Sequence, residues 1–172
     1  MVPDLAVKSR DDIYSLIEHQ VDTFSTKIET WFKRYFTSNP INEKKPQLIV
    51  GTDSSYSHGK TVFTVAIVVN TMGSGAEYIF KRFTVFRYLT IFEKIYSEAH
   101  TSVLVASMLK ENGHVDRFSE LIVHVDANEN ENAKSSQYYH SIMGMVKGCG
   151  FNAVGKPYAF AATNVADRHC RS

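Results

Sequence analysis

The chain has 172 residues, of which 44% are hydrophobic and 22% charged, and its formal net charge is +1. This size and composition are those of one ordinary globular domain, and the near-neutral charge excludes a protein that coats nucleic acid through its overall charge. We expect no membrane span and no secretory signal, because the sequence has neither a long apolar run nor the signal pattern. Since Cys149 and Cys170 are the only cysteines, we expect free thiols in a reducing compartment and predict a cytoplasmic location.

The first forty residues have the pattern of one long amphipathic helix. Ser9 and Asp12 are spaced as a capping box, and Ser38–Pro40 would end the helix. Between these limits apolar residues recur at helical spacing: Ile13, Leu16, Ile17, Val21, Phe24, Ile28, Trp31, Phe32 and Tyr35. This stripe must pack on something, either the core or a second subunit in a homodimer. We therefore predict that residues 1–46, the helix and a polar connector, pack on a domain formed by residues 47–172.

Three strands joined by short turns are expected next. The strands are Gln47–Ser54, Thr61–Val69 and residues 77–87, and the turns are Ser54–Gly59 and Gly73–Gly75. Turns this short favour antiparallel hairpins.

Helices and strands then alternate to the end of the sequence. Residues 90–112 have a helical pattern with Gly113 as a stop signal. The remaining segments are a strand at Leu121–Asp126, a helix near 133–147, a short strand at 152–154 and a helix at 161–169. This order predicts an α/β fold.

The segment Ser54–Thr61 is similar to a phosphate-binding loop whose first glycine has become serine. That motif needs a helix directly after its Lys-Thr pair, so that backbone N–H groups can hold the phosphates. Residues 62–69 are instead β-branched and strand-like. We therefore reject nucleotide binding and interpret Gly59-Lys60 as a hairpin turn.

Two predicted strands end in an aspartate, Asp53 and Asp126. A carboxylate at the end of a buried strand is costly to desolvate, so it usually has a metal ion, a base or a dipole as its partner. Glu98 lies beside the apolar face of the helix at 90–112, and Asp167 lies on the last helix. Acids brought together from separate elements suit Mg²⁺ or Mn²⁺, which prefer carboxylate oxygens. Two such ions roughly 4 Å apart can activate a water and stabilise the leaving oxygen of a phosphodiester.

Alternatives stay open for individual residues. Glu93 is the rival of Glu98, and Glu129 and Glu131 are interpreted as solvated loop acids. Further residues are candidates for supporting the acids or contacting a substrate: Ser54, His124, Lys156 and His169. The histidines could move protons or simply be buried or surface residues, and Lys156 could contact the scissile phosphate or lie in a solvated turn.

Several short segments carry a family resemblance: Val50–Ser54, Ser97–Ala99, Val123–Asp126, Met143–Gly150, Lys156-Pro157 and Ala162–Asp167. On these segments the chain, from about Leu48 to its C-terminus, resembles the ribonuclease H-like superfamily and, within it, the YkuK-like family of predicted nucleases. The resemblance implies a mixed five-stranded sheet with the first three strands antiparallel, strands one and four adjacent and parallel, helices on both faces and an extra N-terminal helix.

The same resemblance implies an activity. Asp53, Glu98, Asp126 and Asp167 would be the catalytic residues and would hold Mg²⁺ or Mn²⁺, two ions in all. The reaction would be hydrolysis of RNA, DNA or a hybrid, leaving a 5′-phosphate and a 3′-hydroxyl. Two alternatives remain: a non-catalytic module on the same fold that binds nucleic acid or protein, and a dimeric junction resolvase. Loss of a central acid would favour the binding module, and all four acids are present.

Overall fold

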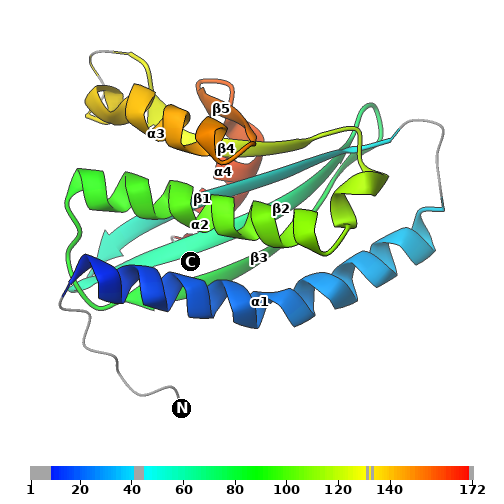
Figure 1. Cartoon of the computed structure of the whole chain (residues 1–172), viewed down its shortest axis with the longest axis horizontal. Helices are drawn as coiled ribbons and strands as arrows, with labels where there is room; N and C mark the ends of the chain where they lie inside the picture. Colours follow the sequence, from blue (N-terminus) through cyan, green and yellow to red (C-terminus); the bar gives the residue numbers. More distant parts are fainter. Residues whose placement is uncertain (1–8, 41–44, 131, 133, 171–172) are drawn as a thin grey trace.

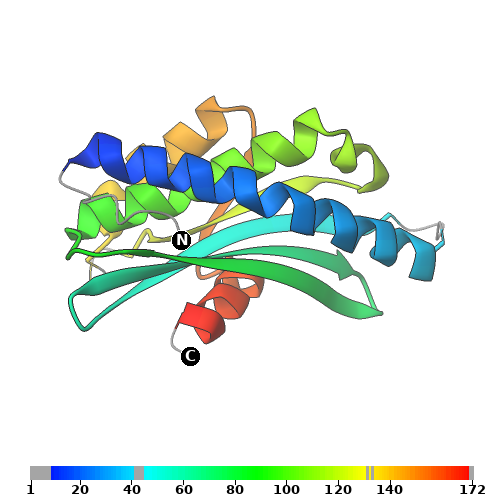
Figure 2. The same cartoon turned by 90° about the horizontal axis from the view of Figure 1, so that it is seen from below.

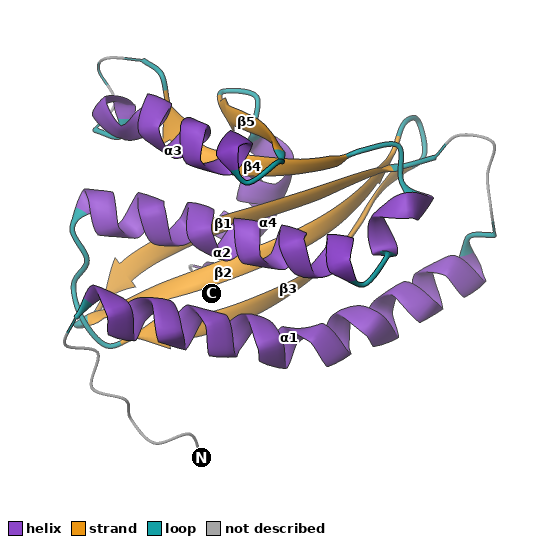
Figure 3. Ribbon diagram, viewed as in Figure 1, coloured by secondary structure: helices purple, strands orange, loops and turns teal. Residues whose placement is uncertain are grey.

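The computed structural model describes residues 9–40, 45–130, 132 and 134–170. Figure 3 shows its helices and strands, and the order predicted from the sequence is confirmed. In chain order the elements are α1 (Arg10–Ser38), β1 (Gln47–Ser57), β2 (Lys60–Thr71), β3 (Gly75–Val85), α2 (Ile91–Glu111), the 3-10 turn η1 (His114–Arg117), β4 (Leu121–Asn128), α3 (Ser136–Gly148), β5 (Asn152–Lys156) and α4 (Phe160–Cys170).

The five strands form one mixed sheet in the order β3-β2-β1-β4-β5. β1, β2 and β3 pair antiparallel through their hairpins, and β4 pairs parallel to both β1 and β5. The parallel pairing of β1 and β4 follows from the long connection between β3 and β4, which contains α2 and allows the chain to cross back over the sheet. The predicted adjacency of the first and fourth strands is confirmed.

Helices cover both faces of the sheet, as predicted. In Figure 2, α1, α2 and α3 lie on one side of the sheet and α4 lies on the other. Successive strand residues face opposite sides. On β1, Leu48 and Val50 join the large core under α1 and α2, whereas Ile49 packs with Val68 and Val165 on the α4 side.

The predicted capping box begins α1. The Ser9 hydroxyl accepts a hydrogen bond from the Asp12 backbone N–H at 3.2 Å, and the Asp12 carboxylate accepts one from the Ser9 N–H at 2.8 Å. The apolar stripe of the helix is buried within its own chain, apart from the partly buried Leu16. The stripe is therefore core, and it is not a surface left over for a homodimer. The division of the chain after residue 46 stays a prediction.

Some predicted boundaries were wrong. The turn expected at Ser54–Gly59 contains only His58 and Gly59, which have positive φ angles of 49° and 77°, and β1 continues to Ser57 because each of its last residues pairs with β2. α3 begins at Ser136 rather than near 133; Ala133 and residues 42–44 of the connector lie outside the described residues.

The rejection of the phosphate-binding loop is confirmed, since Lys60 and Thr61 begin β2 and no helix follows them. Among the described residues, no helix combines the length and the apolar character that crossing a membrane requires.

Candidate metal centre

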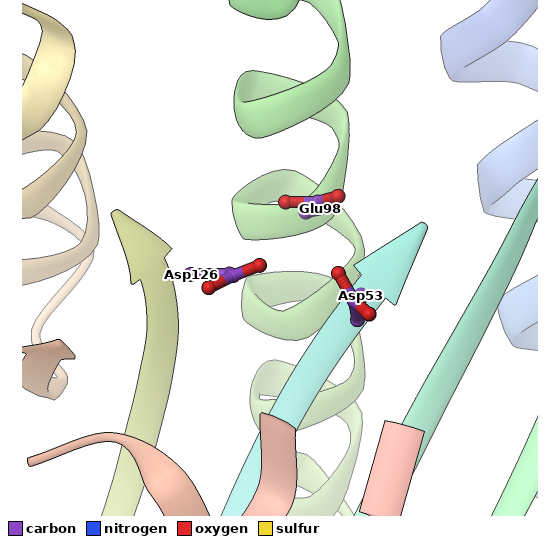
Figure 4. Close-up of side chains that lie close together, drawn as sticks. All are labelled: Asp53, Glu98 and Asp126. Carbon is purple, nitrogen blue, oxygen red and sulfur yellow. The ribbon is translucent and has the colours of Figure 1, made fainter. Parts of the chain in front are cut away.

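The acids meet where two parallel strands separate. The ladder between β1 and β4 runs from Leu48↔Leu121 to Gly51↔His124 and ends there. Asp53 and Asp126 each lie two residues further along their strands. Figure 4 shows β1 and β4 diverging at this point, with α2 behind the gap and the carboxylates of Asp53, Asp126 and Glu98 directed toward one another. One oxygen of each carboxylate lies within 4.8 Å of the others. We call these three residues the acid cluster.

The local structure of α2 delivers Glu98 to the strands. Thr90 caps the helix, and Glu98 lies two turns further on with only 2% of its surface exposed. The Ser54 hydroxyl donates a hydrogen bond to the Glu98 carboxylate at 2.6 Å. One turn later, the hydroxyls of Ser102 and Thr52 share a hydrogen bond of 2.7 Å. These two polar contacts fix the position of the helix over β1.

The rival acid on the same helix has a different role. Glu93 forms a capping box with Thr90 and an ion pair with Arg87 at 2.8 Å. Burial works against ionisation of Glu93, but hydrogen bonds from Thr90 and the charge of Arg87 lower its pKa below the ordinary value. Glu93 therefore stabilises the start of α2, and Glu98 is the acid that joins the two aspartates.

Burial makes the acid cluster electrostatically unfavourable as a set of bare carboxylates. Desolvation and, after it, the nearby Asp126 together raise the pKa of Asp53 to about 7. Desolvation also raises the pKa of Glu98 well above its usual range, against the opposing effect of Lys94. A hard divalent cation would neutralise these buried negative charges, and it suits the cluster because all the donors are carboxylate oxygens.

Two lysines partly balance the cluster. Lys156 forms an ion pair with Asp126, and Lys94 Nζ lies 3.9 Å from Glu98 Oε1. Burial lowers the pKa of Lys156, but its contact with Asp126 outweighs this and raises the pKa. Lys156 was a candidate from the sequence, whereas Lys94 was not. The signal for Lys94 was its position four residues before Glu98 on a helix, a spacing that brings side chains together.

His124 lies outside the acid cluster. It precedes Asp126 by two residues on β4 and is buried next to the backbone of Ala159. Desolvation lowers the pKa of His124 to about 4, so the imidazole is neutral near pH 7. This favours the interpretation of His124 as a buried histidine over that of a proton shuttle.

The two candidate residues of α4, Asp167 and His169, have different surroundings. The His169 ring stacks on Phe80 with 3.8 Å between the ring centroids and lies 3.3 Å from the Tyr78 hydroxyl, so it covers β3. Asp167 is half-buried and is not among the three acids that share the 4.8 Å limit. It lies one turn before Cys170, whose thiol donates a hydrogen bond to the Asp53 carbonyl at 3.1 Å. The role of Asp167 as a fourth ligand stays a prediction.

Glu129 and Glu131 were expected to be solvated loop acids. Glu129 is exposed, as expected for a solvated residue, and Glu131 lies outside the described residues. The Cys170 contact had no signal in the sequence, because a thiol near the end of a helix has no characteristic pattern.

Two solved structures are similar to this chain. RNase H1 from the halophilic archaeon Halobacterium salinarum NRC-1 is similar over 72% of this chain and 98% of that chain, with 12% sequence identity and a TM-score of 0.36. NurA bound to dAMP and manganese is similar over 70% of this chain and 29% of that chain, with 14% identity and a TM-score of 0.25. No curated protein gives a significant match.

The family comparison covers more of the sequence. The family model described as Ribonuclease H-like matches residues 31–171, from the second half of α1 to the end of α4. The chain therefore belongs to the ribonuclease H-like family.

Proposed function

We propose that this protein is a divalent-metal-dependent nuclease that hydrolyses phosphodiester bonds in nucleic acid, with two Mg²⁺ or Mn²⁺ ions as cofactors. The observation that carries the proposal is the acid cluster, three carboxylates from separate elements within 4.8 Å of one another. Membership of the ribonuclease H-like family supports the same reading.

The burial of the acids favours a nuclease over a binding module. A module that only binds nucleic acid needs cations facing the phosphates, and it has no use for a cluster of acids that repel both the phosphates and one another. Asp53 and Glu98 are 7% and 2% exposed, so their charged forms are costly unless a cation is bound. Bound metal ions would offset this cost, which explains why buried acids are found together here.

Each residue of the site then has a task. When bound, the ions would supply a nucleophile at neutral pH and stabilise charge on the leaving oxygen. Asp53, Glu98 and Asp126 would hold them, and the Ser54 hydroxyl keeps the Glu98 carboxylate turned toward the strands. Lys156, partly exposed and paired with Asp126, would contact the phosphate that is cleaved.

We assign Asp167 as the fourth ligand within the same proposal. Its support is the position of α4, which packs against β1 and β4. Cys170 on that helix touches the backbone of Asp53, and residues three apart on a helix lie on neighbouring parts of one face.

The decisive experiment measures Mg²⁺- or Mn²⁺-dependent cleavage of single-stranded and duplex RNA and DNA, hybrids and a four-way DNA junction, with EDTA as the blank. We expect the wild type to cleave and Asp126→Asn to lose at least about a hundredfold to a thousandfold in rate. Glu129→Gln, which removes an exposed acid three residues away, is the matched control and should cleave as the wild type does.

A separate readout tests the metal site without activity. Mn²⁺ should raise the melting temperature of the wild type and of Glu129→Gln, and it should do so much less in Asp126→Asn. Asp126→Asn cleaving at the wild-type rate would refute the site. A wild type that binds metal and cleaves nothing would refute the nuclease and favour the binding module, whereas cleavage restricted to the junction by a dimer would favour the resolvase.

A further inference from the structure

Exposed aromatic residues gather at one end of the molecule, next to the acid cluster. Four of the large apolar side chains that are exposed in the described part of the chain lie here: Tyr56 at the carboxyl end of β1, Phe86 and Tyr88 in the connection between β3 and α2, and Ile91 at the start of α2. Figure 1 shows the tip of β1 and the first turn of α2 at the same end of the molecule. Scattered exposed apolar residues need no explanation, but a group of this kind usually marks a binding surface.

Two tyrosines form the centre of this group. The rings of Tyr56 and Tyr88 lie 5.2 Å apart and perpendicular to each other. The residues are 51% and 61% exposed, so much of each ring is open to solvent although they come from segments far apart in the sequence. Such a pair presents flat apolar surface in a fixed orientation.

The tyrosine pair lies on the Glu98 side of the sheet, near the gap between β1 and β4 across which the acid cluster meets. Ser54 contacts Glu98, and Tyr56 follows Ser54 by two residues on β1, so both side chains point to the α2 face. At the rise of a strand, two residues span roughly 7 Å. A strand of nucleic acid with a phosphate at the acid cluster can therefore place a neighbouring base on these rings.

Basic side chains gather around the start of α2. Lys94, one turn before Glu98, approaches it to 3.9 Å and is more than one-third exposed. Arg10 is exposed over the Phe92 ring, and both Arg10 and Arg87 are paired with Glu93. This combination of aromatic rings and basic side chains is the one that binds single-stranded nucleic acid, since bases stack on the rings while cations contact the backbone.

We propose that Tyr56 and Tyr88 form a stacking platform for unpaired bases, and that the substrate is accordingly a single-stranded or locally unpaired nucleic acid. Bases inside a duplex are already stacked and cannot lie on a protein ring, so the platform selects unpaired strands. The inference rests on the proposed nuclease function for the position of the scissile phosphate, and it adds the substrate class.

The test measures binding in EDTA, where metal-dependent cleavage cannot interfere. The probes are a fluorescein-labelled oligonucleotide as a single strand, the same sequence as a duplex, and the same backbone carrying abasic sites, each as RNA and as DNA. The variants are Tyr56→Leu and Tyr88→Leu, with Tyr56→Phe and Tyr88→Phe to restore the rings. The control is Tyr78→Leu, an exposed tyrosine of β3 that contacts His169 of α4 on the opposite face of the sheet.

We expect the wild type to bind the normal single strand more tightly than the duplex or the abasic strand. Each Leu variant should weaken single-strand binding by about tenfold, whereas the Phe variants and Tyr78→Leu should bind as the wild type does. Unchanged melting temperatures would show that every variant is folded.

Three results would overturn the platform: no preference for the unpaired strand, equal binding of the abasic strand, or Leu variants that bind normally. Normal binding by the Leu variants would favour a partner other than nucleic acid for these rings. Failure of the nuclease proposal is distinguishable, because a wild type that binds single strands through these rings and cleaves none of them keeps the platform and loses the enzyme.

Discussion

α1 and α2 lie side by side on the same face of the sheet (Figure 1), yet they bury different chemistry. Each begins with a capping box. The buried residues of α1 are all aliphatic or aromatic, from Ile13 to Tyr35. Those of α2 include four polar ones: Ser97, Glu98, Thr101 and Ser102. From this difference we infer that α1 mainly stabilises the fold. α2 buries polar side chains in place of apolar ones, and these position the acid cluster.

Hydrogen bonds make the polar face of α2 tolerable. Ser102 pairs with Thr52 at 2.7 Å and Glu98 accepts from Ser54 at 2.6 Å, both across to β1. The Thr101 hydroxyl donates back to the Ser97 carbonyl at 2.7 Å within the helix. A buried polar group with a partner costs little, whereas one without a partner costs about 1–3 kcal/mol. Among the described residues, Glu98 accepts one such hydrogen bond, from Ser54, and has Lys94 at 3.9 Å, so the burial of its charged form is only partly compensated.

The largest effect is expected from Glu98→Gln on α2. Cleavage should fall by at least about a hundredfold to a thousandfold, because the substitution removes a preorganised charge from the site. The melting temperature of the metal-free protein at neutral pH should stay the same or rise. Burial makes the ionised form of Glu98 unfavourable and so raises its pKa, whereas the glutamine amide is uncharged at every pH and avoids that cost. Glu111→Gln, an exposed acid near the end of the same helix, should change neither quantity. A Glu98→Gln protein that loses stability and keeps its activity would contradict the conclusion that α2 positions the site while α1 supplies stability.

The corresponding substitution on α1 should have the opposite profile. Phe24 is 1% exposed, and Phe24→Ala should lower the free energy of unfolding by about 3–5 kcal/mol through lost contacts and a cavity. Urea denaturation measures this loss, and cleavage per folded molecule should be unchanged. Lys33→Ala, at an exposed position of the same helix, should stay within about 0.5 kcal/mol of the wild type.

The smallest effect is expected from pH, and it separates the acid cluster from the rest of the protein. The folded-state pKa of Asp53 is raised from 3.8 to about 7, so between these values the folded state binds more protons than the unfolded state. Stability of the metal-free protein should therefore decline as pH rises from about 4 to 7, and Asp53 should contribute roughly 2–4 kcal/mol of this decline. Asp53→Asn should remove that contribution and leave the one from Glu98, whose pKa is also raised. Glu129→Gln should leave the whole decline, and Mn²⁺ should restore stability at pH 7. Urea titrations at several pH values check all three, and a wild-type curve that rises over this window would contradict the assignment.

The sequence was informative where the determining interactions are local. The capping box at Ser9 and the helical spacing of apolar residues are properties of short segments, so the predicted limits of α1 and α2 were close to those observed. The strand-end positions of Asp53 and Asp126 were visible for the same reason. Their meeting required only that β1 and β4 be parallel neighbours, which the family resemblance implied.

The sequence was misleading where long-range pairing decides. Ser54–Ser57 is a polar, serine-rich run typical of a turn, and it is a strand only because β2 pairs with each of its residues. His169 lies two residues after Asp167, but its ring stacks on Phe80 of β3, a contact between residues far apart in the sequence. The tyrosine platform was equally hidden, since exposure is a property of the folded surface and not of the pattern.

The contact between α1 and β3 has a consequence for how molecules of this protein meet one another. β3 is an edge strand of eleven residues, and an edge of that length offers unpaired backbone groups to the sheet of a second molecule. Lys27 of α1 donates a hydrogen bond to the Phe80 carbonyl at 3.0 Å, and Lys81 reaches Thr23 of the same helix. The helix thus occupies part of the edge and lines it with positive charge, both of which oppose strand-to-strand aggregation. A helix that was first recognised by its apolar face also protects the solubility of the sheet through its polar one.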